Sequence, residues 1–309
     1  MSEFRFYEFN YNKLYPSDMF EDFTYPMGER TVRLTSTDTE PTNAQVLWVD
    51  SPHPDFSFIA QWADLVAHEY PESRIVLVMP FLPGARGDKD VPSPAITNAS
   101  LIADTAITDL ITIDPHSDVW LDTLYVRNKG INVVTVDTPQ IVASALVTHG
   151  LGGGAFTVSS GDENLTLEAP HGLGYAAVIA PDKGARRRAG AVADLIGAPL
   201  YVADKVRDPK TGHILSYVFE GDLNNGDAYL VVDDICDGGG TFVALANSFP
   251  KYADVDLWVT HGGFTKGIAG SGLERYRRIF TTDSLPSATR DDVLVTALYP
   301  FVQEAVQSL

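Results

Sequence analysis

LVVDDICDGGGTF, residues 230–242, places two adjacent carboxylates directly after an apolar run and three glycines shortly behind them. Leu230, Val231 and Val232 form a short continuous apolar stretch, which is typical of a strand buried on both faces. Apolar residues resume at helical spacing in residues 241–249. The stretch therefore predicts a strand, a glycine-rich loop and a helix. This unit decides the fold class, because parallel α/β sheets are built from such units.

The loop of this unit is suited to an anion. Glycines let backbone amides turn toward a ligand, and the following helix adds exposed N–H groups and a positive dipole end. Asp233 and Asp234 would repel a phosphate if they pointed at it, so we expect them to face hydroxyl groups or a hydrated magnesium ion instead. A sugar phosphate meets both demands. The competing interpretation is a surface turn whose acids are only solvated.

The composition favours an acidic soluble enzyme over a nucleic-acid-binding protein. The 309-residue chain carries 41 acidic and 22 basic residues, and its net charge of -19 argues against nucleic acid or an anionic membrane as the main partner. No apolar run approaches the length of a membrane span, and the first residues lack the basic and then apolar order of a secretory signal. We therefore expect a cytoplasmic location. The single cysteine, Cys236, is interpreted as a small apolar filler, because no histidine lies near it in sequence.

Short apolar runs recur along the chain, and helix-like segments separate several of them. This alternation predicts parallel sheets covered on both faces, with ligands gathered at the carboxyl ends of the strands. The length and the alternation indicate two α/β units with a junction near residues 138–142. The predicted strands lie within residues 45–52, 74–86, 110–118, 131–139, 176–184, 199–207, 228–240, 255–263 and 278–286, and clear helices within 56–70 and 185–197.

The segment that follows Lys205 contains many proline, glycine, asparagine and aspartate residues, which predicts a mobile loop or a hairpin. Lys205 and Arg207 form a basic pair at its root, and such a pair would close over an anionic ligand. The competing interpretation is a solvated surface pair, since exposed charges are the rule.

Taken in order, several stretches resemble the ribose-phosphate diphosphokinases, also called phosphoribosyl pyrophosphate synthetases. The resemblance runs from about residue 23 to the end of the chain, and it rests on the order of many weak motifs. These are FTYPMGERTVRL (23–34), MPFLPGARGDKD (79–90), IDPHSD (113–118), APDKGARRRA (180–189), DKVR (204–207), VVDDICDGGGTF (231–242), VTHGGF (259–264) and TTDSLP (281–286).

This resemblance implies an α/β fold of two phosphoribosyltransferase-type (type I) domains with mostly parallel sheets covered by helices. Residues 1–140 would form the N-terminal domain, completed by a C-terminal helix at residues 291–309. Residues 141–290 would form the domain that carries the ribose-phosphate loop. In the family the active site lies between the domains and a neighbouring subunit, which implies a homo-oligomer, at least a dimer.

The resemblance also implies roles for individual residues. Lys205 and Arg207 would be catalytic, stabilising the transferring diphosphate. His116 and Asp182 would hold the Mg²⁺ that accompanies ATP. The residues that would bind ATP are Tyr25, Glu29, Arg86 and His116, and those that would bind ribose phosphate are Asp233, Asp234, Asp237, Gly238, Gly239, Gly240 and Thr241.

The reaction implied by the family moves the β,γ-diphosphate of ATP to the anomeric hydroxyl of ribose 5-phosphate and releases AMP. A protein catalyses such a step mainly by positioning the reactants and neutralising charge. No general base is evident in the sequence. Two further classes are weighed against this one: a phosphoribosyltransferase, in which Arg86, His116 and Lys205 would be idle, and a regulatory homologue that binds ligand without turning it over.

The chain departs from the family pattern at three positions. Met27 stands where the adenine-contacting hairpin usually has an acid, and Gly87 stands where a glutamine usually follows the ATP-site arginine. Gly238 replaces a threonine of the phosphate loop, which removes a hydroxyl donor and is expected to open space beside the 5-phosphate. An esterified phosphate would lose less from this change than a free one, so ADP-ribose is an alternative acceptor, with ADP-ribose pyrophosphate for NAD synthesis as the product.

Overall fold

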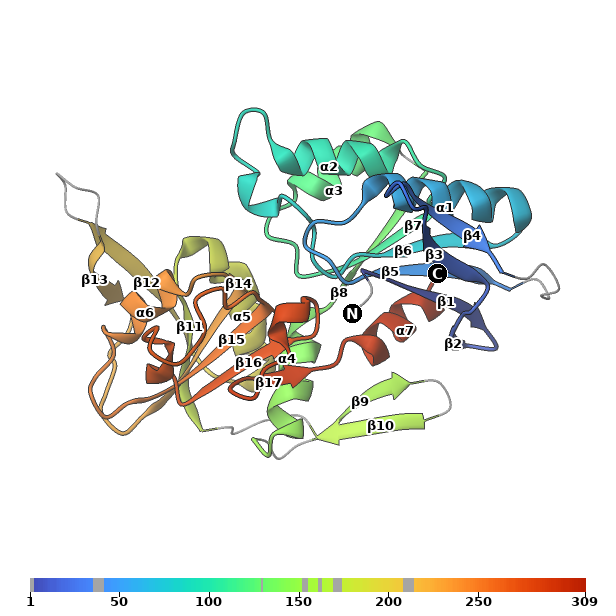
Figure 1. The fold of residues 1–309 in the computed structure, drawn as a ribbon. Coiled ribbons are helices and arrows are strands. Elements are labelled where there is room, and N and C mark those ends of the chain that lie inside the picture. The colour runs from blue at the N-terminus through green and yellow to red at the C-terminus, as the bar shows by residue number, and fades with distance from the viewer. Residues whose placement is uncertain are drawn as a thin grey trace. The chain divides into compact units, whose positions relative to one another are not determined.

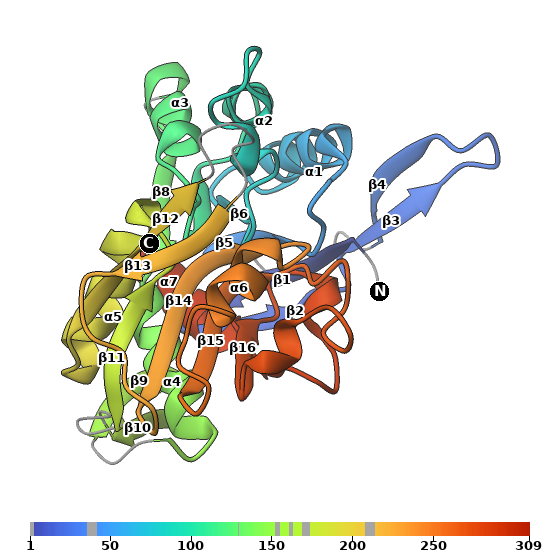
Figure 2. The same cartoon turned by 90° about the vertical axis from the view of Figure 1, so that its left-hand side faces the viewer.

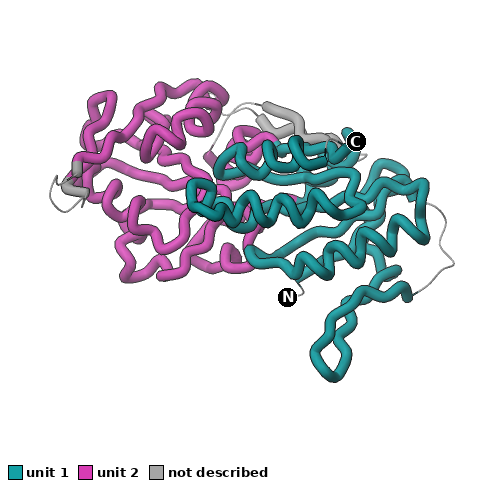
Figure 3. The backbone as a smooth tube through the Cα atoms, turned by 90° about the horizontal axis from the view of Figure 1, so that it is seen from above, with its two compact units in different colours: residues 1–136, 160–162, 299–309 teal, residues 137–159, 163–298 magenta. Residues whose placement is uncertain are grey.

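The computed structural model describes residues 3–35, 42–128, 130–151, 155–160, 163–168, 174–207 and 214–309, without the side chains of 155–160, 163–168, 207, 214 and 215. The chain divides into two compact units (Figure 3). Unit 1 comprises residues 1–136, 160–162 and 299–309, and unit 2 comprises residues 137–159 and 163–298. The unit boundary at residue 137 lies beside the junction expected from the sequence.

Unit 1 is built on a six-stranded sheet (Figure 1). Four of its strands are parallel neighbours, and two N-terminal strands extend the sheet in the antiparallel sense. All six residues of the central strand β5 are buried, as expected for a strand covered on both faces. The spatial order is β2 (Lys13–Pro16), β1 (Phe4–Asn10), β5 (Ala44–Val49), β6 (Arg74–Val78), β7 (Asp109–Ile113) and β8 (Asn132–Val136).

Helices cover both faces of this sheet. The helices α1 (Phe56–Glu69), α2 (Pro94–Ala103) and α3 (Val119–Arg127) pack on one face, where Leu47 and Trp62 belong to one buried apolar cluster. The other face carries α7 (Tyr299–Gln307), whose first residue donates a hydrogen bond from its hydroxyl to the Leu14 carbonyl at 2.5 Å. The C-terminal helix therefore begins later than the expected residue 291. Leu294–Thr296 instead forms a short strand, β17.

A separate two-stranded hairpin belongs to unit 1. It consists of β3 (Phe20–Thr24) and β4 (Arg30–Leu34), paired antiparallel, and it projects away from the sheet in Figure 2. Its turn carries Tyr25, Met27 and Glu29, and the side chain of Met27 is 98% exposed.

Unit 2 is built on a seven-stranded sheet whose strands are parallel except for β13 (Figure 1). The order is β13 (Ile214–Phe219), β12 (Leu200–Arg207), β11 (Tyr175–Ala180), β14 (Ala228–Cys236), β15 (Asp254–Gly262), β16 (Arg278–Thr282) and β17. A small sheet pairs β9 (Ala155–Ser160) with β10 (Glu163–Glu168). The segment expected to form a loop or hairpin forms the antiparallel pair β12–β13, and residues 208–213 between them lie outside the described residues.

The two faces of this sheet are also covered. The helices α4 (Thr138–Thr148) and α5 (Arg186–Ile196) pack together, and α5 contacts β11 and β14. The short helix α6 (Gly240–Ala246) packs on the opposite face, where Phe242 and Leu245 join Ile179 and Val231 in one apolar cluster. The predicted fold class, α/β with mostly parallel sheets covered by helices, is confirmed.

Throughout the part of the chain that the structure describes, no helix is both long enough and apolar enough to cross a bilayer.

Candidate active site

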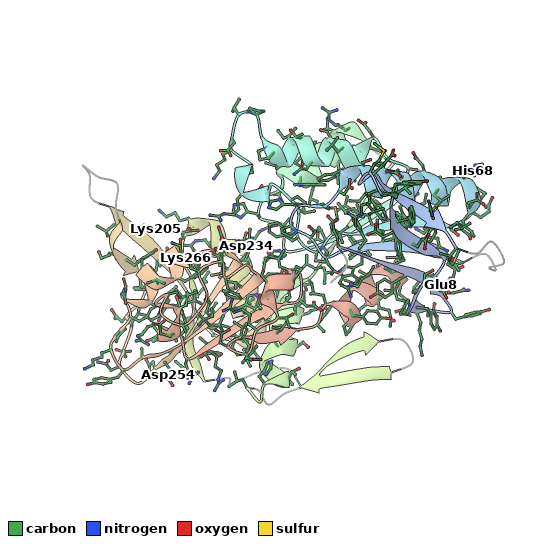
Figure 4. All side chains as sticks on the ribbon, in the orientation of Figure 1. Glu8, His68, Lys205, Asp234, Asp254 and Lys266 are labelled. Carbon is green, nitrogen blue, oxygen red and sulfur yellow. The ribbon has the colours of Figure 1, made fainter. Side chains whose placement is uncertain are left out.

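Two adjacent carboxylates mark the carboxyl end of the central strand β14 in unit 2. Asp234 is 3% exposed, and its backbone N–H donates to the Asp233 carboxylate at 3.0 Å. In Figure 4, Asp234 lies at the same end of unit 2 as Lys205 and Lys266, whereas Asp254 lies at the opposite end. The polar residues predicted from the sequence therefore gather where ligands bind in parallel α/β sheets.

Arg188 compensates the charge of both carboxylates. It projects from the first turn of α5, and its guanidinium lies 3.1 Å from an Asp234 oxygen and 3.5 Å from an Asp233 oxygen. Burial, together with the neighbouring Asp234 carboxylate, nevertheless raises the pKa of Asp233 well above its ordinary value. Arg188 was not among the predicted site residues, although it lies within the stretch APDKGARRRA. Three consecutive arginines gave no sign of which one turns inward.

A second ion pair lies beside the first. The Lys205 ammonium, on β12, donates to the Asp182 carboxylate at 2.8 Å, and the other oxygen of this carboxylate accepts from the Gly184 N–H at 3.0 Å. Burial acts to raise the pKa of Asp182, but the hydrogen bond and charge of Lys205 outweigh it, so the pKa is lowered overall. The side chains of Lys205 and Asp182 are 19% and 44% exposed, so the pair remains within reach of a ligand.

The glycine loop connects β14 to α6 in a conformation that requires glycine at one position. Gly239 has a φ of 75°, and a Cβ atom there would lie 2.8 Å from Leu273. Gly240 is different, because a Cβ atom there would meet nothing within 4 Å. A Cβ atom on Gly238 would lie 3.3 Å from Lys266 Cε, so the space expected beside Gly238 is filled by a lysine side chain. Nothing in the sequence indicated this neighbour, because the lysine comes from a different loop.

Three other residues of this loop have defined contacts. The Asp237 carboxylate accepts from the Thr265 hydroxyl at 2.8 Å, and the Thr241 carbonyl accepts from the Tyr217 hydroxyl at 3.3 Å. Cys236 is fully buried, and burial with the nearby Asp237 and Asp233 charges raises the pKa of its thiol to about 12. Its geometry is that of an apolar filler, as the sequence suggested.

The predicted ATP-binding residues lie in unit 1. Arg86 is exposed in a short 3₁₀ turn, Ala85–Gly87, and His116 is exposed in the loop between β7 and α3. Both loops follow neighbouring parallel strands, β6 and β7, and so leave the sheet at the same edge. Tyr25 and Glu29 are instead placed on the projecting β3–β4 hairpin. The structure explains why position 87 is a glycine, because a Cβ atom there would lie 2.4 Å from Pro94 Cγ.

Within unit 2 the structure brings together Lys205, predicted to be catalytic, Asp182, predicted to bind metal, and Asp233 and Asp234, predicted to bind ribose. The side chain of Arg207 lies outside the described residues. Among the residues that are described, no three His, Cys, Asp or Glu side chains form a ready-made metal cluster. The two predicted metal ligands belong to different units, His116 to unit 1 and Asp182 to unit 2.

The two α/β units, one of them with paired acids and a glycine loop at the end of its central strand, have the fold expected for two phosphoribosyltransferase-type domains. No protein-family model matches the chain. A ribose-phosphate pyrophosphokinase from Marinomonas sp. is 28% identical over 242 residues, or 76% of this chain and 64% of that protein. One from Maricaulis maris is 27% identical over 247 residues, or 76% of this chain and 71% of that protein.

The fold is shared with a solved structure. The crystal structure of phosphoribosylpyrophosphate synthetase from Mycobacterium smegmatis superposes with a TM-score of 0.64 at 21% identity, covering 94% of this chain and 89% of that one. The chain spans about two thirds of the length of the curated relatives named above. The chain is therefore similar in sequence to ribose-phosphate pyrophosphokinases and shares the fold of a phosphoribosylpyrophosphate synthetase.

Proposed function

We propose that the protein is an ATP-dependent diphosphokinase, which transfers the β,γ-diphosphate of ATP to the anomeric hydroxyl of ribose 5-phosphate and releases AMP. The observation that carries the proposal is the grouping of two ion pairs at one edge of the unit 2 sheet. Lys205 with Asp182 supplies a cation for a diphosphate, and Arg188 with the Asp233–Asp234 pair supplies acceptors for sugar hydroxyls.

The acceptor sugar would be held by β14 and its loop. The carboxylates of Asp233 and Asp234 would accept hydrogen bonds from ribose hydroxyls, while Arg188 fixes their orientation. Gly240 and Thr241 begin α6, so their N–H groups have no acceptor within the helix and suit the 5-phosphate. The predicted contribution of Asp237, Gly238 and Gly239 is to shape this loop around the phosphate.

The transfer step requires charge compensation more than acid–base catalysis. As the bond to the β-phosphorus forms and AMP departs, negative charge spreads over the phosphoryl oxygens. The Lys205 ammonium is already oriented by Asp182, so it is preorganised to stabilise that charge. Arg207, at the end of the same strand, would add a second cation. Because proximity and charge supply the acceleration, the absence of an evident base in the sequence is consistent with the chemistry.

ATP would be bound by unit 1 and accompanied by Mg²⁺. Arg86 would contact the phosphates, and Tyr25 and Glu29 would serve the adenine. The carboxylate of Asp182, in unit 2, offers the hard oxygen ligand that Mg²⁺ prefers, and it is partly exposed, so it fits the role of a metal ligand. His116, in unit 1, is the other residue expected to hold the ion. Bound there, Mg²⁺ would neutralise charge on the ATP phosphates.

The proposal is tested by incubating the purified protein with Mg²⁺, ATP and ribose 5-phosphate and measuring AMP release, with the product identified by phosphorus NMR. Formation of AMP together with phosphoribosyl pyrophosphate is expected. ADP as the nucleotide product would contradict diphosphoryl transfer. No AMP with either ribosyl acceptor would favour the two other classes, a phosphoribosyltransferase or a regulatory homologue.

ADP-ribose is the second candidate acceptor, and the geometry at Gly240 supports it. A Cβ atom at Gly240 would meet nothing within 4 Å, so the loop has room for a substituent on the 5-phosphate at this point. The product would be ADP-ribose pyrophosphate, which a partner transferase would use for NAD synthesis. Parallel AMP-release assays with the two acceptors at matched concentrations decide between them through kcat/KM.

We also propose that the active form is at least a dimer. The β3–β4 hairpin projects from unit 1 and exposes the side chains of Tyr25 and Met27, which are 43% and 98% accessible. In the family such a hairpin completes the adenine site of a neighbouring subunit. Sedimentation at assay concentrations tests this, and a catalytically active monomer would contradict it. The cytoplasmic location stays a prediction.

A further inference from the structure

Lys266 is held against the glycine loop by a tight turn. The N–H groups of Gly263 and Phe264 both donate to the Cys236 carbonyl, at 2.8 and 3.1 Å, and the Thr265 N–H donates to the Asp237 carbonyl at 3.0 Å. The Thr265 hydroxyl also bonds the Asp237 carboxylate. These bonds fix the backbone of the lysine turn relative to the loop that it covers.

The backbone of this turn is strained where it approaches the loop. Phe264 is 2% exposed and has a φ of 43°, a left-handed conformation that is unfavourable for a residue other than glycine. Strain of this kind persists only where the surrounding contacts enforce it, and it is common at binding sites. The contacts that enforce it here are the hydrogen bonds to Cys236, the residue two positions before Gly238.

The side chain of Lys266 replaces the side chain that Gly238 lacks. A Cβ atom on Gly238 would lie 3.3 Å from Lys266 Cε, 3.4 Å from Cδ and 3.6 Å from Cγ. The lysine stem therefore passes beside Gly238. A side chain at position 238 would press on the lysine stem, which would have to shift by a few tenths of an ångström.

The Lys266 ammonium is left to bind something else. Across the described ranges of the chain, no side chain or carbonyl forms a hydrogen bond or ion pair with it, and the residue is exposed. Other basic side chains near the site, Lys205 and Arg188, are already paired with carboxylates. An unpaired cation beside a glycine loop, in a chain of net charge -19, is placed to bind an anion.

We propose that Lys266 is a specificity-determining residue that binds phosphoryl oxygens on the 5-position of the ribosyl acceptor. Its ammonium takes the place of the hydroxyl that a threonine at position 238 would supply, with a full positive charge and a longer reach. The inference rests on the proposed function, because it assigns the phosphorylated end of the acceptor to the loop of residues 237–241.

The test compares Lys266→Met, which keeps the stem and removes the charge, with Lys266→Arg, which keeps the charge. A hydrogen bond to a charged group is strong, so Lys266→Met is expected to raise the KM for the acceptor about tenfold or more. The KM for ATP and the kcat are expected to stay within about twofold of the wild type, and Lys266→Arg to restore most of the acceptor affinity. Lys251→Ala is the matched control, since Lys251 is exposed near the opposite end of β15.

Two acceptors separate the possible anions. A loss of affinity with ribose 5-phosphate assigns Lys266 to the 5-phosphate, and a loss confined to ADP-ribose assigns it to the second phosphate. Either result supports an anion ligand. An unchanged acceptor KM in Lys266→Met, or an equal rise in Lys251→Ala, overturns the inference.

Calorimetry separates this inference from the proposed function, because acceptor binding can be measured without turnover. If the wild type binds ribose 5-phosphate or ADP-ribose but releases no AMP, the diphosphokinase proposal fails, and the Lys266→Met binding constant still decides the role of Lys266. A wild type that binds neither acceptor overturns the inference as well.

Gly238→Thr provides a further check. Its added side chain must displace the lysine stem, so it is expected to weaken acceptor binding in the wild type but have little effect in a Lys266→Ala background.

Discussion

Replacement of Lys205 by methionine is the sharpest test of the proposed chemistry. The ammonium is preorganised by its 2.8 Å hydrogen bond to Asp182, and removal of one preorganised donor commonly raises a reaction barrier by about 3–4 kcal/mol. We therefore expect kcat for AMP release to fall by a factor of about one hundred to one thousand. The KM for ribose 5-phosphate is expected to change little, because the proposed acceptor contacts lie on β14 and its loop.

The same replacement is expected to have little effect on stability. The Asp182 side chain is 44% exposed, and partly exposed ion pairs typically contribute about 0–1 kcal/mol. Without Lys205, Asp182 keeps its hydrogen bond from the Gly184 N–H. The pKa of Asp182 is lowered in the folded protein, so its contribution is present at neutral pH and is lost as the pH falls through that lowered pKa. The small stability difference from the wild type should therefore vanish in acid.

The assay combines steady-state AMP release with urea unfolding of the same preparations. Lys251→Ala, which removes an exposed lysine outside the site, controls for the loss of one positive charge from an acidic chain. Turnover of Lys205→Met within about threefold of the wild type would refute the assigned role. A large drop in the urea midpoint would show that the Lys205 side chain stabilises the fold, and it would refute the expectation that the replacement has little effect on stability.

Three further perturbations test the environment of the acids and the loop. Arg188→Gln leaves two adjacent carboxylates without their cation, so we expect it to lower the free energy of unfolding, measured in urea, by about 3–5 kcal/mol. Adding Asp234→Asn should recover part of this loss. Unchanged stability of Arg188→Gln would contradict the pairing. Because the pKa of Asp233 is raised on folding, the native state holds a proton that the unfolded state releases, and stability falls as the pH rises from the ordinary aspartate pKa toward that raised value. Asp233→Asn should remove this pH dependence of stability and abolish activity. The variant should therefore melt at a higher temperature than the wild type at pH 8 but not at pH 4. The same difference in melting temperature at both pH values would be evidence against the raised pKa. Gly239→Ala should lower the free energy of unfolding by about 1–2 kcal/mol from the positive φ alone. Gly240→Ala has open space around its Cβ atom, so its urea midpoint should equal that of the wild type. Equal midpoints for the two variants would contradict the loop geometry.

The strand, loop and helix at residues 228–246 could be predicted because each local preference agrees with the final structure. The apolar run of β14 requires burial on both faces, and the acids and glycines that follow it cannot continue a buried strand. Ion pairing could not be predicted in the same way. Arg188 is separated from Asp234 by 46 positions in the chain, and Lys266 meets Gly238 only after β15 has paired with β14.

The two ends of the chain show the limits of a local interpretation. The N-terminal pair β1–β2 was not predicted, although its turn at Tyr11 and Asn12, with φ of 48° and 61°, is typical of a tight hairpin. At the other end, a helix was expected from residue 291, whereas Leu294–Thr296 pairs with β16 and the helix starts at Tyr299. A parallel strand of three residues at the edge of a sheet has almost no local signal, because its partner is supplied by the tertiary fold.

The two glycines that depart from the family pattern, Gly87 and Gly238, both have a side chain from another segment beside them. At Gly87 the volume of a side chain is taken by Pro94, whose Cγ would lie 2.4 Å from a Cβ atom. At Gly238 it is taken by the stem of Lys266. In both places a side chain from another part of the chain occupies the position that a side chain on the glycine would fill. The loss of a residue type at a motif position therefore does not by itself create an empty space, and at Gly238 it exchanges a neutral hydroxyl for a cation. A change in acceptor preference would then follow from charge at the edge of the loop rather than from added volume.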